Sequence, residues 1–234
     1  DPGRRVHDLR LELDQKKGEQ ALEGLGAASN AIFVKCDVSR SEEVERLVQT
    51  AVDKFGRLDN VVANAGIVHS CDPLDLTEQD LDRVLSVNLK GVVFLGQFAA
   101  KVMLKQEPDQ HGERGTIINM SSVNGVMTIP EIAAYCMSKG AVNQWTKALA
   151  IRLASQGVRV NGVGPGSINT EMFQAVAESP EKLARILSRT PMARAGEPDE
   201  IAKTTAFLAS HYSSYMSGQT IYPDGGRLGL NYTV

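Results

Sequence analysis

The sequence predicts an α/β fold in which a doubly wound, parallel β-sheet forms a single domain. Short apolar segments alternate with helix-like segments of ten residues or more, and strands joined by such helices form right-handed βαβ units. No linker rich in Pro, Gly or Ser and no repeat divides the 234 residues, so one domain over residues 1–234 is expected. The predicted strands end in small or polar residues. In an open α/β sheet, ligands bind at the edge formed by these strand ends.

The composition excludes several classes of protein. With 42% hydrophobic and 23% charged residues the chain is not disordered. Its 25 basic and 28 acidic residues are scattered, so no nucleic-acid partner is expected. The three cysteines are far apart and form no CxxC pair, and the four histidines lack the spacing of metal ligands, so no metal site is expected. Free cysteines also indicate a reducing compartment. No apolar run has the length of a membrane span and no signal peptide is visible, so we expect a cytoplasmic protein without a membrane partner.

In the first part of the chain the elements follow from periodicity and caps. Leu9, Leu11 and Leu13 alternate with polar residues, which predicts a half-exposed strand, with a helix from about Asp8 as the alternative. Further along, a buried strand is predicted over 31–38, a helix from Ser41 as N-cap to its stop at Gly56, and a short strand over 59–63.

The rest of the chain continues the alternation of strands and helices. Two long helices are predicted over 78–105 and 132–155, separated by a polar loop and a strand. The strands are expected over 116–120, 158–163 and 219–222, and two further helical segments over 171–189 and 198–210.

Tyr135 and Lys139 are the strongest chemical signal. They are four residues apart in Tyr-Cys-Met-Ser-Lys, and residues with this spacing share one face of a helix. A nearby ammonium group favours the phenolate and lowers the pKa of a tyrosine from about 10. Such a phenol exchanges a proton with an alcohol or a carbonyl near neutral pH. The alternative is a surface helix with a solvated lysine.

Other polar residues at predicted strand ends strengthen this interpretation. Ser122 ends a strand thirteen residues before Tyr135, and Asn88 lies within the preceding helical segment. Further features, in chain order, are Asp37-Val38, Asn64-Ala65-Gly66, Pro165-Gly166 with Thr170, and Asp224-Gly225-Gly226. Together these motifs resemble the classical short-chain dehydrogenase/reductase family over residues 12–226.

The resemblance implies a Rossmann-like, NAD(P)-dependent oxidoreductase that interconverts a secondary alcohol and a ketone as its small-molecule substrate. It makes Tyr135 the general acid/base, and Lys139 the residue that lowers the pKa of Tyr135 and holds the nicotinamide ribose. Ser122 orients the substrate carbonyl, and Asn88 holds a water that connects Lys139 to a proton relay. The family's two long helices, here near 78–105 and 132–155, imply a homotetramer.

The resemblance also implies where the cofactor binds. Asp37 and Val38 would line the adenine, and Asn64, Ala65 and Gly66 would lie along the cofactor. At the other end, Pro165, Gly166, Ile168 and Thr170 would approach the nicotinamide. The substrate itself cannot be deduced, although its pocket would involve Asn124, Glu131 and residues 169–194.

The sequence departs from the family at its N-terminal end. The family begins with a strand and a glycine-rich turn, TGxxxGxG, that holds the diphosphate, but Gly3 is the only glycine before Gly18. In the strand order 3-2-1-4-5-6 this first strand is central, so its neighbours are expected to lack a partner. The chain is expected to be a truncated fragment, a splice variant, or a protein whose N-terminus forms a substitute strand.

Two expectations follow from this departure. Without the phosphate-binding turn, a catalytically inactive, dehydrogenase-like binding or scaffold protein is the alternative to an enzyme. By the family pattern the segment near Leu11 is the second strand, and its terminal acid is Glu12, with Asp14 as the second choice. A carboxylate there accepts hydrogen bonds from the adenosine ribose and repels a 2′-phosphate, so NAD is preferred over NADP.

Overall fold

The computed structural model describes residues 7–25, 30–177 and 179–230. Its strands are β1 (His7–Glu12), β2 (Asn30–Lys35), β3 (Asn60–Ala63), β4 (Gly115–Met120), β5 (Val158–Val163) and β6 (Thr220–Ile221). Its helices are α1 (Gln15–Glu23), α2 (Ser41–Phe55), α3 (Glu78–Leu85), α4 (Gly91–Met103), α5 (Ala133–Leu153), α6 (Glu171–Val176), α7 (Pro180–Leu187) and α8 (Pro198–Ala209). The alternation of strands and helices is the one that the sequence predicts.

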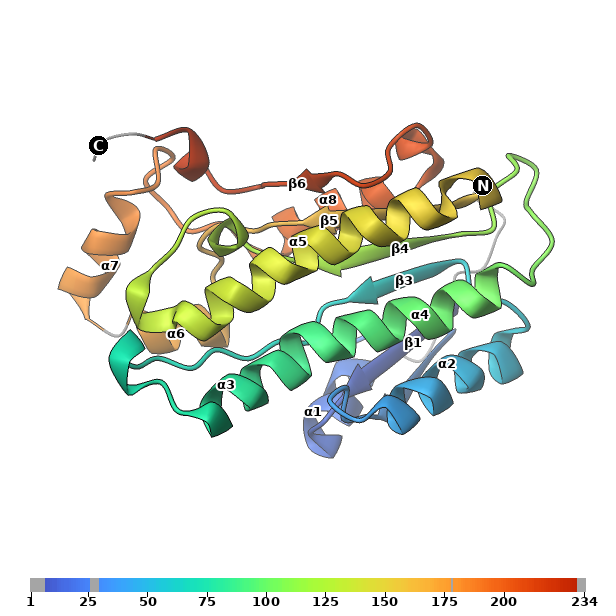
Figure 1. Cartoon of the computed structure of the whole chain (residues 1–234), viewed down its shortest axis with the longest axis horizontal. Coiled ribbons are helices and arrows are strands. Elements are labelled where there is room, and N and C mark those ends of the chain that lie inside the picture. Colours follow the sequence, from blue (N-terminus) through green and yellow to red (C-terminus); the bar gives the residue numbers. More distant parts are fainter. Residues whose placement is uncertain (1–6, 26–29, 178, 231–234) are drawn as a thin grey trace.

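The strands form two parallel sheets instead of one continuous sheet. β1 pairs with β2, while β3, β4, β5 and β6 pair in that order. In Figure 1, α4 and α5 cross one side of β3 and β4, and α8 lies behind the strands. Within the described residues β1 and β3 each keep one edge without a strand partner. This confirms the expectation that the strands next to the missing central strand are left unpaired.

The N-terminal segment forms a strand, so the alternative of a helix from about Asp8 is wrong. β1 ends at Glu12 because Asp14 then caps α1, its carboxylate accepting hydrogen bonds from the amides of Lys16 and Lys17. Glu12 therefore lies at the carboxyl end of a parallel strand, as the resemblance implies. A substitute strand formed by residues 1–6 would lie outside the described residues.

Three helix predictions need correction. α2 begins at Ser41, but its N-cap is Arg40, without a side-chain cap. The helix expected over 78–105 is interrupted by a π-helical turn at Ser86–Lys90. The segment expected over 171–189 is divided into α6 and α7, because Pro180 begins a new helix whose N-cap is Ser179.

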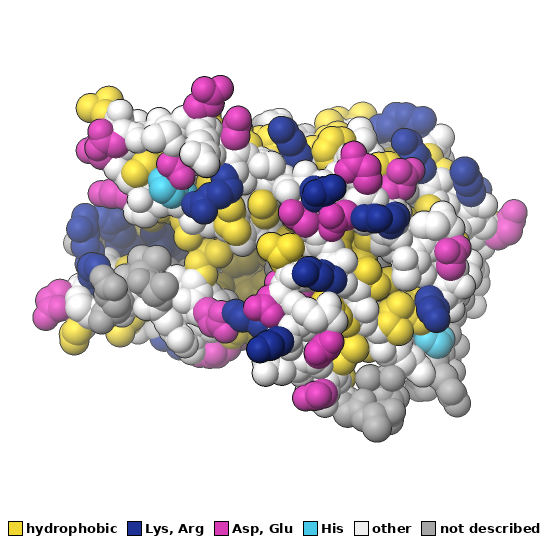
Figure 2. Space-filling view, turned by 90° about the horizontal axis from the view of Figure 1, so that it is seen from below, with side chains coloured by type: hydrophobic (Ala, Val, Ile, Leu, Met, Phe, Trp, Pro, Cys, Tyr) yellow, Lys and Arg dark blue, Asp and Glu magenta, His cyan; other side chains and the backbone are white. Residues whose placement is uncertain are grey.

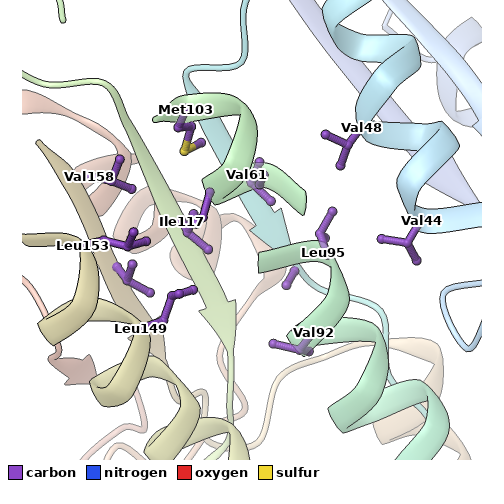
Figure 3. Packing of buried hydrophobic residues seen from close by; sticks show 14 of the residues in the cluster. Val44, Val48, Val61, Val92, Leu95, Met103, Ile117, Leu149, Leu153 and Val158 are labelled. Carbon is purple, nitrogen blue, oxygen red and sulfur yellow. The ribbon is translucent and has the colours of Figure 1, made fainter. Parts of the chain in front are cut away.

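The main hydrophobic core lies between β3–β5 and the helices α2, α4 and α5. Figure 3 shows side chains from these elements facing one another, with Ile117 of β4 between α4 and α5. Ile117, Val158 and Met103 are fully buried. This core lies on the side of the strands covered by α4 and α5, and it holds these helices firmly against β4 and β5.

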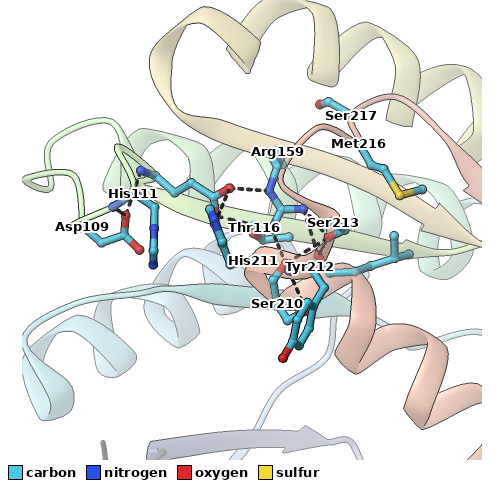
Figure 4. A network of polar contacts seen from close by, with 12 residues as sticks. Asp109, His111, Thr116, Arg159, Ser210, His211, Tyr212, Ser213, Met216 and Ser217 are labelled. Carbon is cyan, nitrogen blue, oxygen red and sulfur yellow. Dashed lines mark hydrogen bonds and ion pairs between the residues drawn. The ribbon is translucent and has the colours of Figure 1, made fainter. Parts of the chain in front are cut away.

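A second buried group, around Arg159, fastens the amino ends of β4 and β5 to the segment after α8 (Figure 4). Arg159 is 6% exposed, and its guanidinium donates to Glu113, Thr116 and Ser213 at 2.9, 3.1 and 2.8 Å. It also donates to the carbonyls of Leu208 and Ser210. Buried charge is tolerated here because every donor group has an acceptor and Glu113 supplies the opposite charge.

None of the helices in the described part of the chain is long and apolar enough to cross a membrane. Among the same residues, no group of three or more His, Cys, Asp or Glu side chains could hold a metal ion.

Candidate active site

Tyr135 and Ser122 meet at the carboxyl end of β4. Ser122 follows this strand by two residues and is 6% exposed, and its hydroxyl accepts a hydrogen bond from the amide of Asn124 at 3.1 Å. Tyr135 reaches it from the first turn of α5. Burial raises the pKa of Tyr135, and a hydrogen bond with Ser122 partly opposes this shift. The pair places two hydroxyl groups where one substrate oxygen could contact both.

The predicted lowering of the Tyr135 pKa by Lys139 is therefore not observed. The Lys139 ammonium nitrogen lies 5.6 Å from the centre of the Tyr135 ring, and the loss of solvation dominates the titration of the phenol. With its pKa above the ordinary value, Tyr135 is protonated at neutral pH. In this state the phenol can donate a proton to a carbonyl oxygen.

Lys139 is buried in the same place. It is 3% exposed, its ammonium donates to the carbonyl of Met120 at 2.8 Å, and burial lowers its pKa to about 8. No acidic side chain forms an ion pair with it within the described residues. The alternative of a solvated surface lysine is excluded.

The burial of Lys139 predicts a pH-dependent stability. The fall in pKa from 10.5 to about 8 corresponds to about 3 kcal/mol. The unfolded chain keeps its proton between these pH values while the native lysine has lost it, so stability rises as the pH increases from about 8 to 10.5. We expect Lys139→Met to raise the free energy of unfolding at pH 7 by up to about 3 kcal/mol and to remove this rise. Urea unfolding at several pH values measures both effects.

The matched control is Lys147→Met, because Lys147 lies on the same helix and is exposed. This variant should keep the wild-type stability at pH 7 and the same dependence on pH. An Lys139→Met protein that still gains stability between pH 8 and 10.5 like the wild type would show that another group causes the rise.

Asn88 reaches the site because of the π-helical turn between α3 and α4. In this turn the amide of Gly91 donates to the carbonyl of Ser86, five residues earlier, and such turns occur often at functional sites. Asn88 is fully buried, and its amide group exchanges two hydrogen bonds with the backbone of Ile67, at 2.8 and 2.9 Å. A side chain added at Gly66 would come within 3.5 Å of both Asn88 Oδ1 and Lys139 Nζ. Gly66, Asn88 and Lys139 therefore enclose one small space.

Ser138 is a contributor that the sequence reasoning missed. It is fully buried, donates to the carbonyl of Tyr135 at 2.7 Å, and accepts from Asn88 Nδ2 at 3.1 Å. It thus connects the helix of Tyr135 and Lys139 to the π-helical turn. The available signal was its place directly before Lys139, on the face of α5 that meets the helix containing Asn88.

The loop from Pro165 to Thr170 lies beside the segment that carries Ser122. The carbonyl of Pro165 accepts from the amide of Val123 at 3.0 Å, which fixes the loop beside Ser122. A side chain at Gly166 would come within 2.8 Å of the Asp224 backbone, so glycine allows this close approach. Thr170 caps α6 by accepting from Phe173. Ile168 pairs with Gly196 through a β-bridge and packs in a second apolar cluster.

The remaining predicted cofactor residues lie at or near strand ends. Glu12 accepts hydrogen bonds from the amides of Leu13 and Asp14. Asp37 uses one oxygen in a turn with Ser39, and Val38 is buried against Gly91. Asn64 is exposed just after β3, while Ala65 packs against the main core.

Helices α1 and α6 follow the two ends of the predicted cofactor site, Glu12 and Thr170. Lys17 of α1 and Glu171 of α6 form an exposed ion pair at 2.8 Å, although 154 residues separate them. Figure 2, which shows the molecule from below, reveals a hollow with hydrophobic walls on the side where Figure 1 places α1, α3 and α6. A ligand that reached from Glu12 to Thr170 would run along this side of the protein.

The family model described as enoyl-(acyl carrier protein) reductase matches residues 6–227, nearly the whole chain. The chain belongs to the short-chain dehydrogenase/reductase family. Members of this family use NAD(P), and the protein is accordingly an oxidoreductase with a Rossmann-like α/β fold.

Curated relatives and solved structures of the short-chain dehydrogenase/reductase family agree with this assignment. The chain is 40% identical over 222 residues to an uncharacterized oxidoreductase from Mycobacterium bovis, covering 94% of this chain and 84% of the relative. It is 40% identical over 190 residues to a 3-oxoacyl-[acyl-carrier-protein] reductase from Thermotoga maritima, covering 81% and 74%. A crystal structure of gluconate 5-dehydrogenase from Burkholderia cenocepacia with NADP and tartrate superposes with a TM-score of 0.86 at 30% identity, covering 95% and 85%.

Proposed function

We propose that this short-chain dehydrogenase/reductase interconverts a secondary alcohol and a ketone, with Tyr135 as the general acid/base. The observation that supports this most strongly is the position of Tyr135 between Ser122, which counteracts the rise of its pKa, and the buried ammonium of Lys139, 5.6 Å from its ring. A bound nicotinamide cofactor supplies or accepts the hydride. Ser122 and Tyr135 bind the substrate oxygen, and Tyr135 donates its proton to this oxygen in the direction of reduction.

Lys139 and Asn88 have supporting roles in this proposal. Lys139 has three donor protons and, among the described residues, one hydrogen-bond acceptor, the Met120 carbonyl, so its ammonium can also hold the nicotinamide ribose. Asn88, fixed by Ile67 and Ser138, can hold a water next to Lys139. A proton lost by Tyr135 is then replaced through Lys139 and this water.

The residues of the site fit the nicotinamide and the adenosine ribose of the cofactor better than its diphosphate. The space bounded by Gly66, Asn88 and Lys139 and the loop containing Gly166 suit the nicotinamide end, and Glu12 suits the adenosine ribose. The glycine-rich turn that would hold the diphosphate is not in the sequence. The second candidate is a dehydrogenase-like binding or scaffold protein without catalytic activity.

Titration of the chain with NADH, followed by nicotinamide fluorescence or by energy transfer from Trp145, distinguishes these candidates. Binding in the micromolar range supports the enzyme. If neither the chain nor a form extended upstream by a strand, a glycine-rich turn and a helix binds NADH, the scaffold protein becomes the better proposal.

We also propose that NAD is preferred over NADP because of Glu12. Its carboxylate would accept hydrogen bonds from ribose hydroxyls and repel a 2′-phosphate. We expect Glu12→Ala to shift the ratio of the NADH and NADPH dissociation constants toward NADPH by about tenfold. The control Glu19→Ala, on the exposed surface of α1, should leave the ratio unchanged. A wild-type protein that prefers NADPH would contradict the role given to Glu12.

We propose that the protein forms a homotetramer, as the two long helices of the family imply. The outer face of α4 and α5 has a cavity of about 390 Å³ lined by residues that include Lys101, Trp145 and Arg152. Ile151, also on α5, is 81% exposed, as expected for a residue covered in an assembly. Light scattering should give a mass close to four chains, and a stable monomer would contradict the proposal.

A further inference from the structure

Arg227 is a buried arginine in contact with the loop that contains Gly166. It follows the Asp224-Gly225-Gly226 turn and is 7% exposed. Its Nη1 donates to the hydroxyl of Ser167 at 3.0 Å. Ser167 comes directly after Gly166, in the loop that the proposed function places at the nicotinamide. Neither Arg227 nor Ser167 was a candidate from the sequence.

The turn before Arg227 is built to direct this side chain inward. Asp224 accepts hydrogen bonds from the amides of Gly226 and Leu228, one on each carboxylate oxygen, at 2.9 and 2.7 Å. Gly226 has a φ of 90°, a backbone conformation that favours glycine. Asp224 therefore shapes the turn with both oxygens and forms no ion pair with Arg227.

The contrast with Arg159 shows that Arg227 is not an ordinary buried structural arginine. Arg159 has a carboxylate partner and acceptors for each of its nitrogens. Arg227 has no ion pair with any described residue, and its Nε is buried without a hydrogen-bond partner among them. Burial and the neighbouring Arg189 lower the pKa of Arg227, and the negative charge of Asp224 partly opposes this shift. A buried cation without an ion pair is costly, so its hydrogen bond to Ser167 calls for a functional explanation.

The backbone of the loop is already fixed at several points. The amide of Gly166 donates to Pro223, that of Gly196 to Ser167, and that of Asn169 to Gly196, at 3.2, 2.9 and 2.8 Å. The charge-assisted bond from Arg227 holds the side chain of Ser167 between these points. It thus connects the C-terminal segment directly to the middle of the loop.

We propose that Arg227 is a positioning residue, which holds Ser167 and thereby keeps the Pro165–Thr170 loop in the shape that receives the nicotinamide end of the cofactor. This inference rests on the proposed function. The proposal predicts different effects at the two ends of the cofactor: Arg227 should affect binding of the nicotinamide and not of the adenosine part.

The test compares Arg227→Gln, Arg227→Lys and Ser167→Ala with the control Lys203→Gln. The control removes a positive charge from an exposed position on α8 and leaves the bond to Ser167 in place. Two properties are measured on the full chain: hydrogen exchange of the backbone amides of residues 166–170, and dissociation constants for NADH and for ADP-ribose, which lacks the nicotinamide.

For Arg227→Gln and Ser167→Ala we expect at least tenfold faster exchange of the loop amides and about tenfold weaker NADH binding. ADP-ribose binding should stay within about twofold. Arg227→Lys should restore part of the NADH affinity, because lysine keeps the charge and one donor. Lys203→Gln should behave like the wild type.

The outcomes that overturn the inference are distinct from failure of the proposed function. Unchanged loop exchange in Arg227→Gln overturns it, whether or not the wild type binds NADH. An equal loss of NADH and ADP-ribose binding also overturns it, because that pattern indicates general destabilisation. If the wild type binds neither ligand but loop exchange increases in Arg227→Gln, the proposed function fails and the role of Arg227 in holding the loop is supported.

Discussion

Tyr135→Phe is expected to lower kcat by about 10²–10⁴-fold, the usual contribution of a general acid or base. The phenol lies beside Ser122 and is protonated at neutral pH, since burial raises its pKa. Phenylalanine keeps the ring and its packing on α5, so the midpoint of thermal unfolding and the dissociation constant for NADH should change little. The measurement is turnover of a panel of ketones with NADH and of secondary alcohols with NAD.

Tyr222→Phe is the matched control. Tyr222 is another partly buried tyrosine with a raised pKa, and its hydroxyl accepts a hydrogen bond from Asn143 at 3.2 Å. Its loss should cost about 1 kcal/mol of stability and leave turnover nearly intact. A Tyr135→Phe protein that retains wild-type turnover would remove Tyr135 from the mechanism, whichever substrate is found.

The second large effect concerns the unpaired edges of β1 and β3. We expect an upstream extension that supplies an apolar strand, a glycine-rich turn and a helix to raise the free energy of unfolding by about 5 kcal/mol. The added strand would hydrogen-bond on both sides and join the two sheets. It would also cover apolar surface such as Val62, which is 39% exposed in β3. Urea unfolding gives the stability, and its m-value should increase with the surface buried.

The control for the extension carries prolines at alternate positions of the added strand, because proline has no amide hydrogen and disrupts strand pairing. This version should show neither the gain in stability nor an increase in NADH affinity. If both versions stabilise the protein equally, the added strand does not pair with β1 and β3, and the gain comes from elsewhere in the extension.

The sequence alone was sufficient for the order of strands and helices. The strand over 158–163 agrees with β5 at both ends, because this valine-rich segment is bounded by Gly157 and Gly164. The unpaired edges were also predictable, since the absence of a strand and glycine turn can be read directly from the sequence. The resemblance to the family came from motifs that the sequence shows directly, among them Asn88, Ser122 and Tyr135 with Lys139.

Only the tertiary structure decided how these residues behave. Spacing predicted a lowered pKa for Tyr135, but the pKa depends on solvation, and burial raises it. The π-helical turn that carries Asn88 has no clear periodicity signal, because one extra residue in a helix leaves the apolar pattern almost unchanged. The contact of Arg227 with Ser167 joins positions 60 residues apart. Local sequence sets the propensity for each element, whereas burial and long-range contacts arise only when these elements pack together.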